Sequence, residues 1–166
     1  MTGVAALTLG HTAISLVGIF SGLGVLALML EGRDNPGWTR MFLITTVLTS
    51  VTGYIFPFTR LLPSHVVGAV SLVVLAVVLY ARYARAEQGH WAAVFVVGSV
   101  LALWLNVFVL VAQLFAKVPA LQTLAPTQTE PPFGVTQLAV LAVFVVLGFR
   151  ALRRARAAAA GPRATV

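Results

Sequence analysis

Five long apolar stretches, separated by short polar ones, constrain this chain more than any other feature. They cover residues 4–30, 38–58, 63–83, 91–115 and 133–150. Each has roughly 18 to 27 residues, and a helix needs about 20 to cross the hydrocarbon core of a bilayer. Lipid offers a backbone no hydrogen-bond partner, so only helices satisfy it at such lengths. The sequence therefore predicts an all-α membrane protein, a single domain built as a bundle of five transmembrane helices.

The composition agrees with lipid as the main solvent. The chain is 60% hydrophobic and 9% charged, whereas soluble domains carry about 25% charged residues. It has no cysteine, which excludes disulfides and thiolate metal sites. Its net charge of +7 is concentrated after the last apolar stretch, at Arg150, Arg153, Arg154, Arg156 and Arg163. A basic cluster that follows a membrane span is typical of a topology anchor and not of a nucleic-acid-binding surface, so we expect no nucleic-acid partner.

The same arginines predict an orientation. Basic residues favour the cytoplasmic side, so the tail 151–166 is predicted to be cytoplasmic. Five crossings then leave the N-terminus outside. The longest connection, 116–132, becomes an extracytoplasmic loop, and long loops in compact bundles are usually lids or binding loops. The spacing of Val118, Leu121 and Leu124 favours a short amphipathic turn there, within an ordered cap over the outer end of the bundle.

Strongly polar residues inside the predicted spans lie toward one end. A helix rises about 1.5 Å per residue, which puts each of them about 20 Å or more above the cytoplasmic end of its span. They are His11, Tyr54, His65, Asn106, Gln113 and Gln137, and Arg60 lies in the adjoining loop. Asn106 and Gln113 are seven residues apart and so share a helix face. This clustering predicts a pocket in the extracytoplasmic half of the bundle, lined by these residues.

The two histidines suggest the sharpest form of such a pocket. His11 and His65 fall at similar depth on different helices, as the two axial ligands of a b-type haem do. Tyr54 or Arg60 would then lie near the haem propionates. Two alternatives remain open from the residues alone. In the first, both rings lie at the membrane interface and contact water or headgroups. In the second, they bind a quinone, a metal ion or another small ligand.

Hydrolytic chemistry has little support in the sequence. The acidic residues are Glu31, Asp34, Glu87 and Glu130. Only Glu130 falls near the predicted pocket, so a catalytic carboxylate pair or a carboxylate-rich metal site is not readily assembled. Capping of the last span by Glu130 is the favoured interpretation. Whether the protein is an enzyme is left open by these observations.

Three segments carry a resemblance to a known group of proteins. They are residues 52–58 (TGYIFPF), 63–68 (PSHVVG) and the stretch from Leu105 to Phe133. In these segments the chain resembles a family of small proteobacterial integral membrane proteins that has no known activity. The resemblance covers the second to fifth spans. It implies a bacterial inner-membrane location, and it implies no cofactor and no site residue.

Three functional hypotheses follow. The first is a redox or ligand-binding membrane protein, with haem b held by His11 and His65 as its narrowest form. The second is a non-catalytic accessory or assembly subunit that docks onto other membrane subunits, or onto itself, through the small-residue pair Gly18 and Gly22. The third, transport of a small solute, is disfavoured, because the cytoplasmic half of the spans holds only apolar residues and small hydroxyls and so lacks a polar path.

Overall fold

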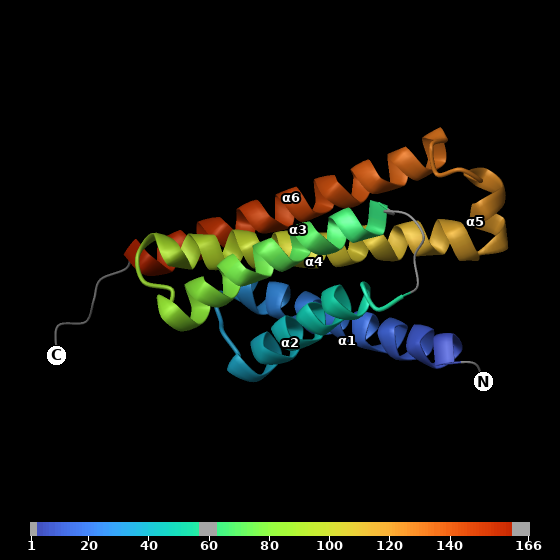
Figure 1. Cartoon of the computed structure of the whole chain (residues 1–166). Coiled ribbons are helices and arrows are strands. Elements are labelled where there is room, and N and C mark those ends of the chain that lie inside the picture. The colour runs from blue at the N-terminus through green and yellow to red at the C-terminus, as the bar shows by residue number, and fades with distance from the viewer. Residues whose placement is uncertain (1–2, 57–62, 161–166) are drawn as a thin grey trace.

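Helices make up nearly all of the backbone in the computed structural model, which describes residues 3–56 and 63–160 (Figure 1). The elements in order are α1 (Gly3–Glu31), α2 (Pro36–Thr52), α3 (Pro63–Leu79), the π-helical turn η1 (Tyr80–Ala84), α4 (His90–Lys117), α5 (Pro119–Leu124) and α6 (Pro131–Ala160). Within the described ranges no strand occurs. The prediction of an all-α bundle is confirmed.

Four of the described helices are long and apolar enough to cross a membrane, as expected for a multi-pass membrane protein. They are α1, α4, α6 and the stretch His65–Ala84, which joins α3 to η1. The remaining predicted span, residues 38–58, is shorter in the structure, because α2 has 17 residues and ends at Thr52. The N–H groups of Tyr54 and Ile55 bond to carbonyls three residues back. The α-helix thus ends at Thr52, although the residues that follow it include the apolar Ile55 and Phe56.

The helices form two layers (Figure 1). α1 and α2 lie side by side in one layer, and α3, α4 and α6 make up the other. Half of the most apolar window of α4 is buried, since α4 packs against α1, α3 and α6. The two termini lie at opposite ends of the bundle. We call the end with the start of α1 and the turn after α2 the histidine end, and the opposite end, with η1, the arginine end.

Glycines on α1 allow the two layers to meet closely. A Cβ added at Gly22 would lie 2.7 Å from Leu103 Cδ1 of α4 and 2.8 Å from the Phe42 ring of α2. One at Gly18 would lie 3.2 Å from Thr45 Oγ1. Both glycines are buried. The predicted small-residue pair therefore brings helices together within the chain, and its two glycines are covered there by α2 and α4.

The arginine end is held by a branched ion pair. Arg82 donates to Asp34 at 2.6 Å and to Glu87, and its guanidinium lies 5.3 Å from the centre of the Phe95 ring. The side chain of Arg82 is only 16% exposed. The loop before α4 carries Glu87 to this position with a φ of 55°, a left-handed conformation that costs a non-glycine residue free energy. The ion pair thus ties the turn after α1 to the turn after η1.

The last helix extends beyond its predicted end at residue 150. α6 runs to Ala160, so the first ten residues of the predicted tail 151–166 are helical. Ala151 is fully buried, and Arg154 Nη2 lies 3.5 Å from the Glu31 carbonyl oxygen at the end of α1. The arginines from Arg150 onward end the apolar pattern of the sequence, but the helix and its packing against the bundle continue beyond residue 150. Residues 161–166 of the tail lie outside the described residues.

The predicted cap, 116–132, contains the short helix α5. Leu121 of α5 and the buried Ala125 pack against Phe115 of α4 and against Phe133 of α6. The Glu130 carboxylate accepts hydrogen bonds from the Thr127 hydroxyl and from two backbone N–H groups of the same loop. Desolvation acts to raise the pKa of Glu130, but these hydrogen bonds together bring it below its usual range. Glu130 thus stabilises the loop that leads into α6.

Candidate functional site: a cavity at the histidine end

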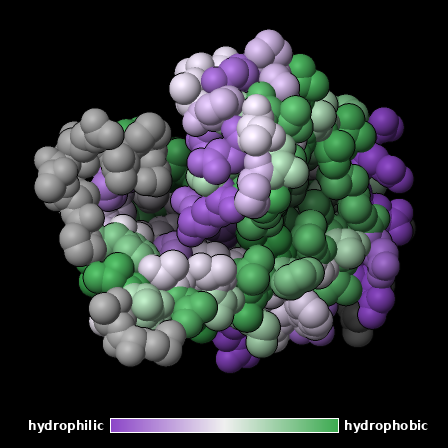
Figure 2. All heavy atoms as spheres, turned by 90° about the vertical axis from the view of Figure 1, so that its right-hand side faces the viewer, coloured by the Kyte–Doolittle hydropathy of each residue, from purple (hydrophilic) through white to green (hydrophobic). Residues whose placement is uncertain are grey.

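A cavity of about 580 Å³ opens at the histidine end between α1, α2, α3 and α4. Figure 2 looks onto this end and shows a hollowed face where hydrophilic and hydrophobic residues meet. Ligand sites commonly have volumes of about 300–1,000 Å³. The polar lining consists of Thr8, His11, Thr12, Ser15, Thr49, Ser50, Tyr54, His65, Ser71, Asn106, Gln113 and Lys117. Five of the residues predicted for the pocket are therefore brought together.

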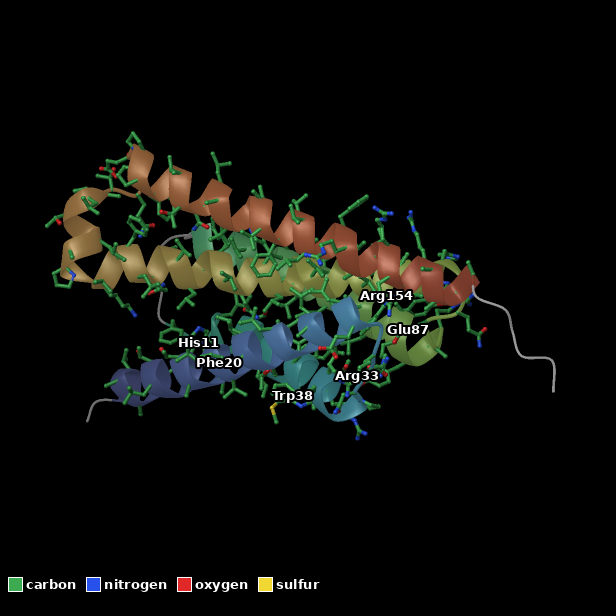
Figure 3. The ribbon with its side chains drawn as sticks, turned by 180° about the vertical axis from the view of Figure 1, so that it is seen from behind. His11, Phe20, Arg33, Trp38, Glu87 and Arg154 are labelled. Atoms are coloured by element: carbon green, nitrogen blue, oxygen red, sulfur yellow. The ribbon has the colours of Figure 1, made fainter. Side chains whose placement is uncertain are left out.

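His11 presents a defined hydrogen-bonding state. Its Nδ1 lies 2.8 Å from Thr52 Oγ1, and the Thr52 hydroxyl proton is directed to the Leu48 carbonyl at 2.7 Å. Thr52 then accepts from His11 Nδ1–H, and when the ring is neutral this tautomer leaves Nε2 as the acceptor atom. The Phe56 ring meets the imidazole edge-on at 5.3 Å between centroids. Figure 3 shows His11 on the side of α1 that faces α4.

Tyr54 and His65 form the wall made by α2 and α3. The Tyr54 hydroxyl donates to the backbone carbonyl of His65 at 2.6 Å, and the two rings lie 5.7 Å apart. Gly68, one turn further along α3, leaves room for the tyrosine, because an added Cβ would lie 3.2 Å from the Tyr54 hydroxyl oxygen. His65 is 7% exposed. This contact joins the turn after α2 to the first turns of α3 and closes the cavity on that side.

The α4 wall carries the amides predicted to share a face. Asn106 and Gln113 both line the cavity. The Asn106 Nδ2 group donates to Thr46 Oγ1 of α2 at 3.2 Å, so this residue also links the two layers at the deep end. Gln113 is exposed and lies nearer the histidine end, one turn before Lys117. The heptad spacing therefore identified this wall correctly.

One described residue predicted for the pocket, Gln137, is not among those that line this cavity. Gln137 of α6 is buried on another side of α4, where its Nε2 donates to the Phe108 carbonyl at 3.1 Å. Its Oε1 has no partner among the described residues. Depth along a span does not give the direction in which a side chain points, and α6 does not reach the cavity. Arg60 lies outside the described residues.

Other residues of the site were not selected from the sequence. Thr52 is not among the lining residues but contacts and orients His11. Its sequence signal, as part of a threonine series, is equally consistent with helix packing. The buried Ser50 and Ser71 carry no distinguishing pattern. Several hydroxyls are already bonded to their own helices, such as Thr8 to the Val4 carbonyl and Ser15 to the His11 carbonyl. These hydroxyls consequently add little net polarity to the cavity.

The electrostatics of the cavity are one-sided. Among the described residues of the lining, Lys117 is the one that is formally charged, and none is a carboxylate. Within the described part of the chain, no group of three or more His, Cys, Asp or Glu residues is arranged to hold a metal ion. The site can therefore accept hydrogen bonds at His11 Nε2, donate and accept them at the amides, and attract negative charge at Lys117.

Comparison with protein-family models, with curated proteins and with solved structures finds no match to this chain.

Proposed function

We propose that this chain is a ligand-binding membrane protein whose histidine-end cavity holds a small, neutral or anionic amphipathic molecule. The observation that carries the proposal is the convergence of His11 of α1 with Asn106 and Lys117 of α4 on one cavity of about 580 Å³. Apolar side chains such as Leu105 and Leu110 complete the lining. A largely apolar pocket with a few convergent polar groups is the usual form of a small-molecule site.

We further propose that the chain crosses a bacterial inner membrane five times, with its N-terminus outside. α2 supports a fifth crossing, since its 17 residues span about 26 Å, and 17 is within the range observed for transmembrane helices. One face of α2 exposes large apolar side chains, namely Trp38, Met41, Ile44, Leu48 and Val51. Termini at opposite ends of the bundle agree with an odd number of crossings. The arginine end would then be cytoplasmic.

The ligand proposal is tested by analysing what the protein carries when purified in mild detergent. Small molecules extracted from the wild type are identified by mass spectrometry and compared with those from Val109→Trp, which fills the cavity from α4. The matched control, Val145→Trp, makes the same change on α6, where Val145 is 61% exposed. We expect a stoichiometric molecule in the wild type and the control that is absent from Val109→Trp. Identical extracts from all three folded proteins would contradict the proposal.

A haem form of the proposal has its own supporting observation. Metal-bound histidines usually donate their other ring N–H to a neighbouring oxygen, as His11 does to Thr52. His65 lines the same cavity, so a porphyrin between the two rings is a second candidate. Protein from haem-supplemented cells should then show a Soret band that shifts on reduction and is lost in His11→Ala. A colourless, folded preparation would eliminate haem and leave the broader ligand-binding proposal in place.

A further inference from the structure

The cavity is closed on one side and open on another. Toward α2 and α3 the deep lining is buried, with Ser50 at 7%, His65 at 7% and Ser71 at 5% exposure, whereas Tyr54 in the turn after α2 is 37% exposed. Toward α1 and α4 the lining is accessible, since Leu16 is 37% and Leu114 is 40% exposed. An accessible side of the cavity therefore lies between α1 and α4.

This opening runs along the side of the bundle. Leu16 lies in the middle of α1, thirteen residues after its first residue, Gly3, which corresponds to about 20 Å along the helix axis. An exposed leucine at that depth faces hydrocarbon in a protein that spans a bilayer. Leu114, by contrast, lies one turn from the end of α4. The rim thus extends from the histidine end into the depth of the adjoining leaflet.

The polar groups are concentrated at the outer part of this opening. Lys117 is the last residue of α4 and contributes a positive charge, the one formal charge among the described lining residues. Gln113 is exposed one turn below it, and His11 lies on the facing side of α1. The first turn of α3 also lines the cavity through His65, and a helix N-terminus favours negative charge. Further along the lining, Leu16 of α1 and Leu110 and Leu114 of α4 supply apolar surface beside the hydroxyls of Thr12 and Ser15.

We propose that the occupant is an anionic membrane phospholipid that enters sideways from the leaflet between α1 and α4. Its phosphate headgroup lies at Lys117 and Gln113, and one acyl chain runs inward along Leu114, Leu110 and Leu16. This arrangement places the negative headgroup at Lys117, where the described lining holds no carboxylate, and the acyl chain along the apolar side chains of α1 and α4. The inference rests on the proposed ligand-binding function and names the class of ligand and its route.

Native mass spectrometry in mild detergent tests this inference, with phosphatidylglycerol and phosphatidylcholine as the probes. The wild type should retain one phosphatidylglycerol in preference to phosphatidylcholine. Lys117→Gln should weaken that retention about fivefold, the effect of losing one basic contact worth about 1 kcal/mol. The matched control Arg156→Gln removes the same charge from the exposed arginine-end part of α6 and should have no effect. Glycerol phosphate, which lacks acyl chains, should not displace the lipid.

A second part of the test measures lipid retention after the cavity is filled, by comparing Val109→Trp with its control Val145→Trp. Loss of lipid from the first and not from the second places the lipid in the cavity. Equal retention of both lipids, together with no effect of Lys117→Gln, would overturn the inference. So would retention in folded Val109→Trp, or displacement by glycerol phosphate. In each of these cases the ligand-binding proposal is judged separately, by whether extracts of the wild type contain another molecule that Val109→Trp lacks.

Discussion

Replacing Gly22 by alanine tests the close packing of α1 against α2 and α4. The new methyl carbon would lie 2.7 Å from Leu103 Cδ1 and 2.8 Å from the Phe42 ring, well inside ordinary contact distance. Both neighbours are 1% exposed and have no free space into which to move. Overpacking of this kind costs about 1–3 kcal/mol, and the better helix propensity of alanine returns about 0.5–1 kcal/mol. We expect a net loss of roughly 0.5–2 kcal/mol.

Gly10→Ala is the matched control, because Gly10 lies on the same helix and an added Cβ meets nothing within 4 Å. This variant should keep the propensity gain alone and be unchanged or slightly stabilised. The assay is reversible unfolding in mixed micelles, followed by circular dichroism, from which the free energy of unfolding is obtained for each variant. If Gly22→Ala proves as stable as Gly10→Ala, the close approach of α1 to α2 and α4 is refuted.

Three further predictions concern individual contacts. Thr52→Val removes the acceptor of His11 Nδ1–H, at a stability cost of about 0.5–1.5 kcal/mol. The ¹⁵N spectrum of the His11 ring should then report a change of tautomer, whereas Thr52→Ser should keep the wild-type tautomer. Asp34→Asn should lower the free energy of unfolding by about 1 kcal/mol, and a double-mutant cycle with Arg82→Gln should return most of that value as coupling. The pKa of Glu130 is lowered in the folded state, so its contribution is complete above about pH 4.3 and lost as pH falls further. Hydrogen exchange in its loop should therefore accelerate on acidification in the wild type, and Glu130→Gln should show no such pH dependence.

The sequence predicts helices well here because lipid permits few alternatives. The predicted span 91–115 corresponds to α4 at His90–Lys117, and the apolar run alone locates it. The end of α2 differs because Ile55 and Phe56 continue the hydropathy pattern after the α-helix has ended at Thr52 and given way to turns at Tyr54 and Ile55. The end of α6 differs for the opposite reason, since arginines interrupt the apolar pattern without interrupting the helix.

The candidate site was harder to predict than the spans. In a membrane, residues that face lipid and residues that face protein are both apolar, so hydropathy does not show which way a helix is turned. Asn106 and Gln113 were assigned to one face by spacing within a single helix, which needs no knowledge of its neighbours. To place Gln137, the rotation of α6 about its own axis relative to α4 must be known. The hydrogen bond from Gln137 to the Phe108 carbonyl shows that rotation. The role of Thr52 likewise depends on a contact between two helices.

The length of α6 has a practical consequence. Its 30 residues measure about 45 Å, whereas the hydrocarbon core is about 30 Å thick. If the membrane is centred on the apolar part of α6, the arginine-rich segment projects from the bilayer as a rod, with Ala151 packed at its base. A soluble helical domain fused in register at Ala160 would continue that rod without a flexible joint. Such a fusion would give this small bundle a rigid marker for particle alignment in electron microscopy.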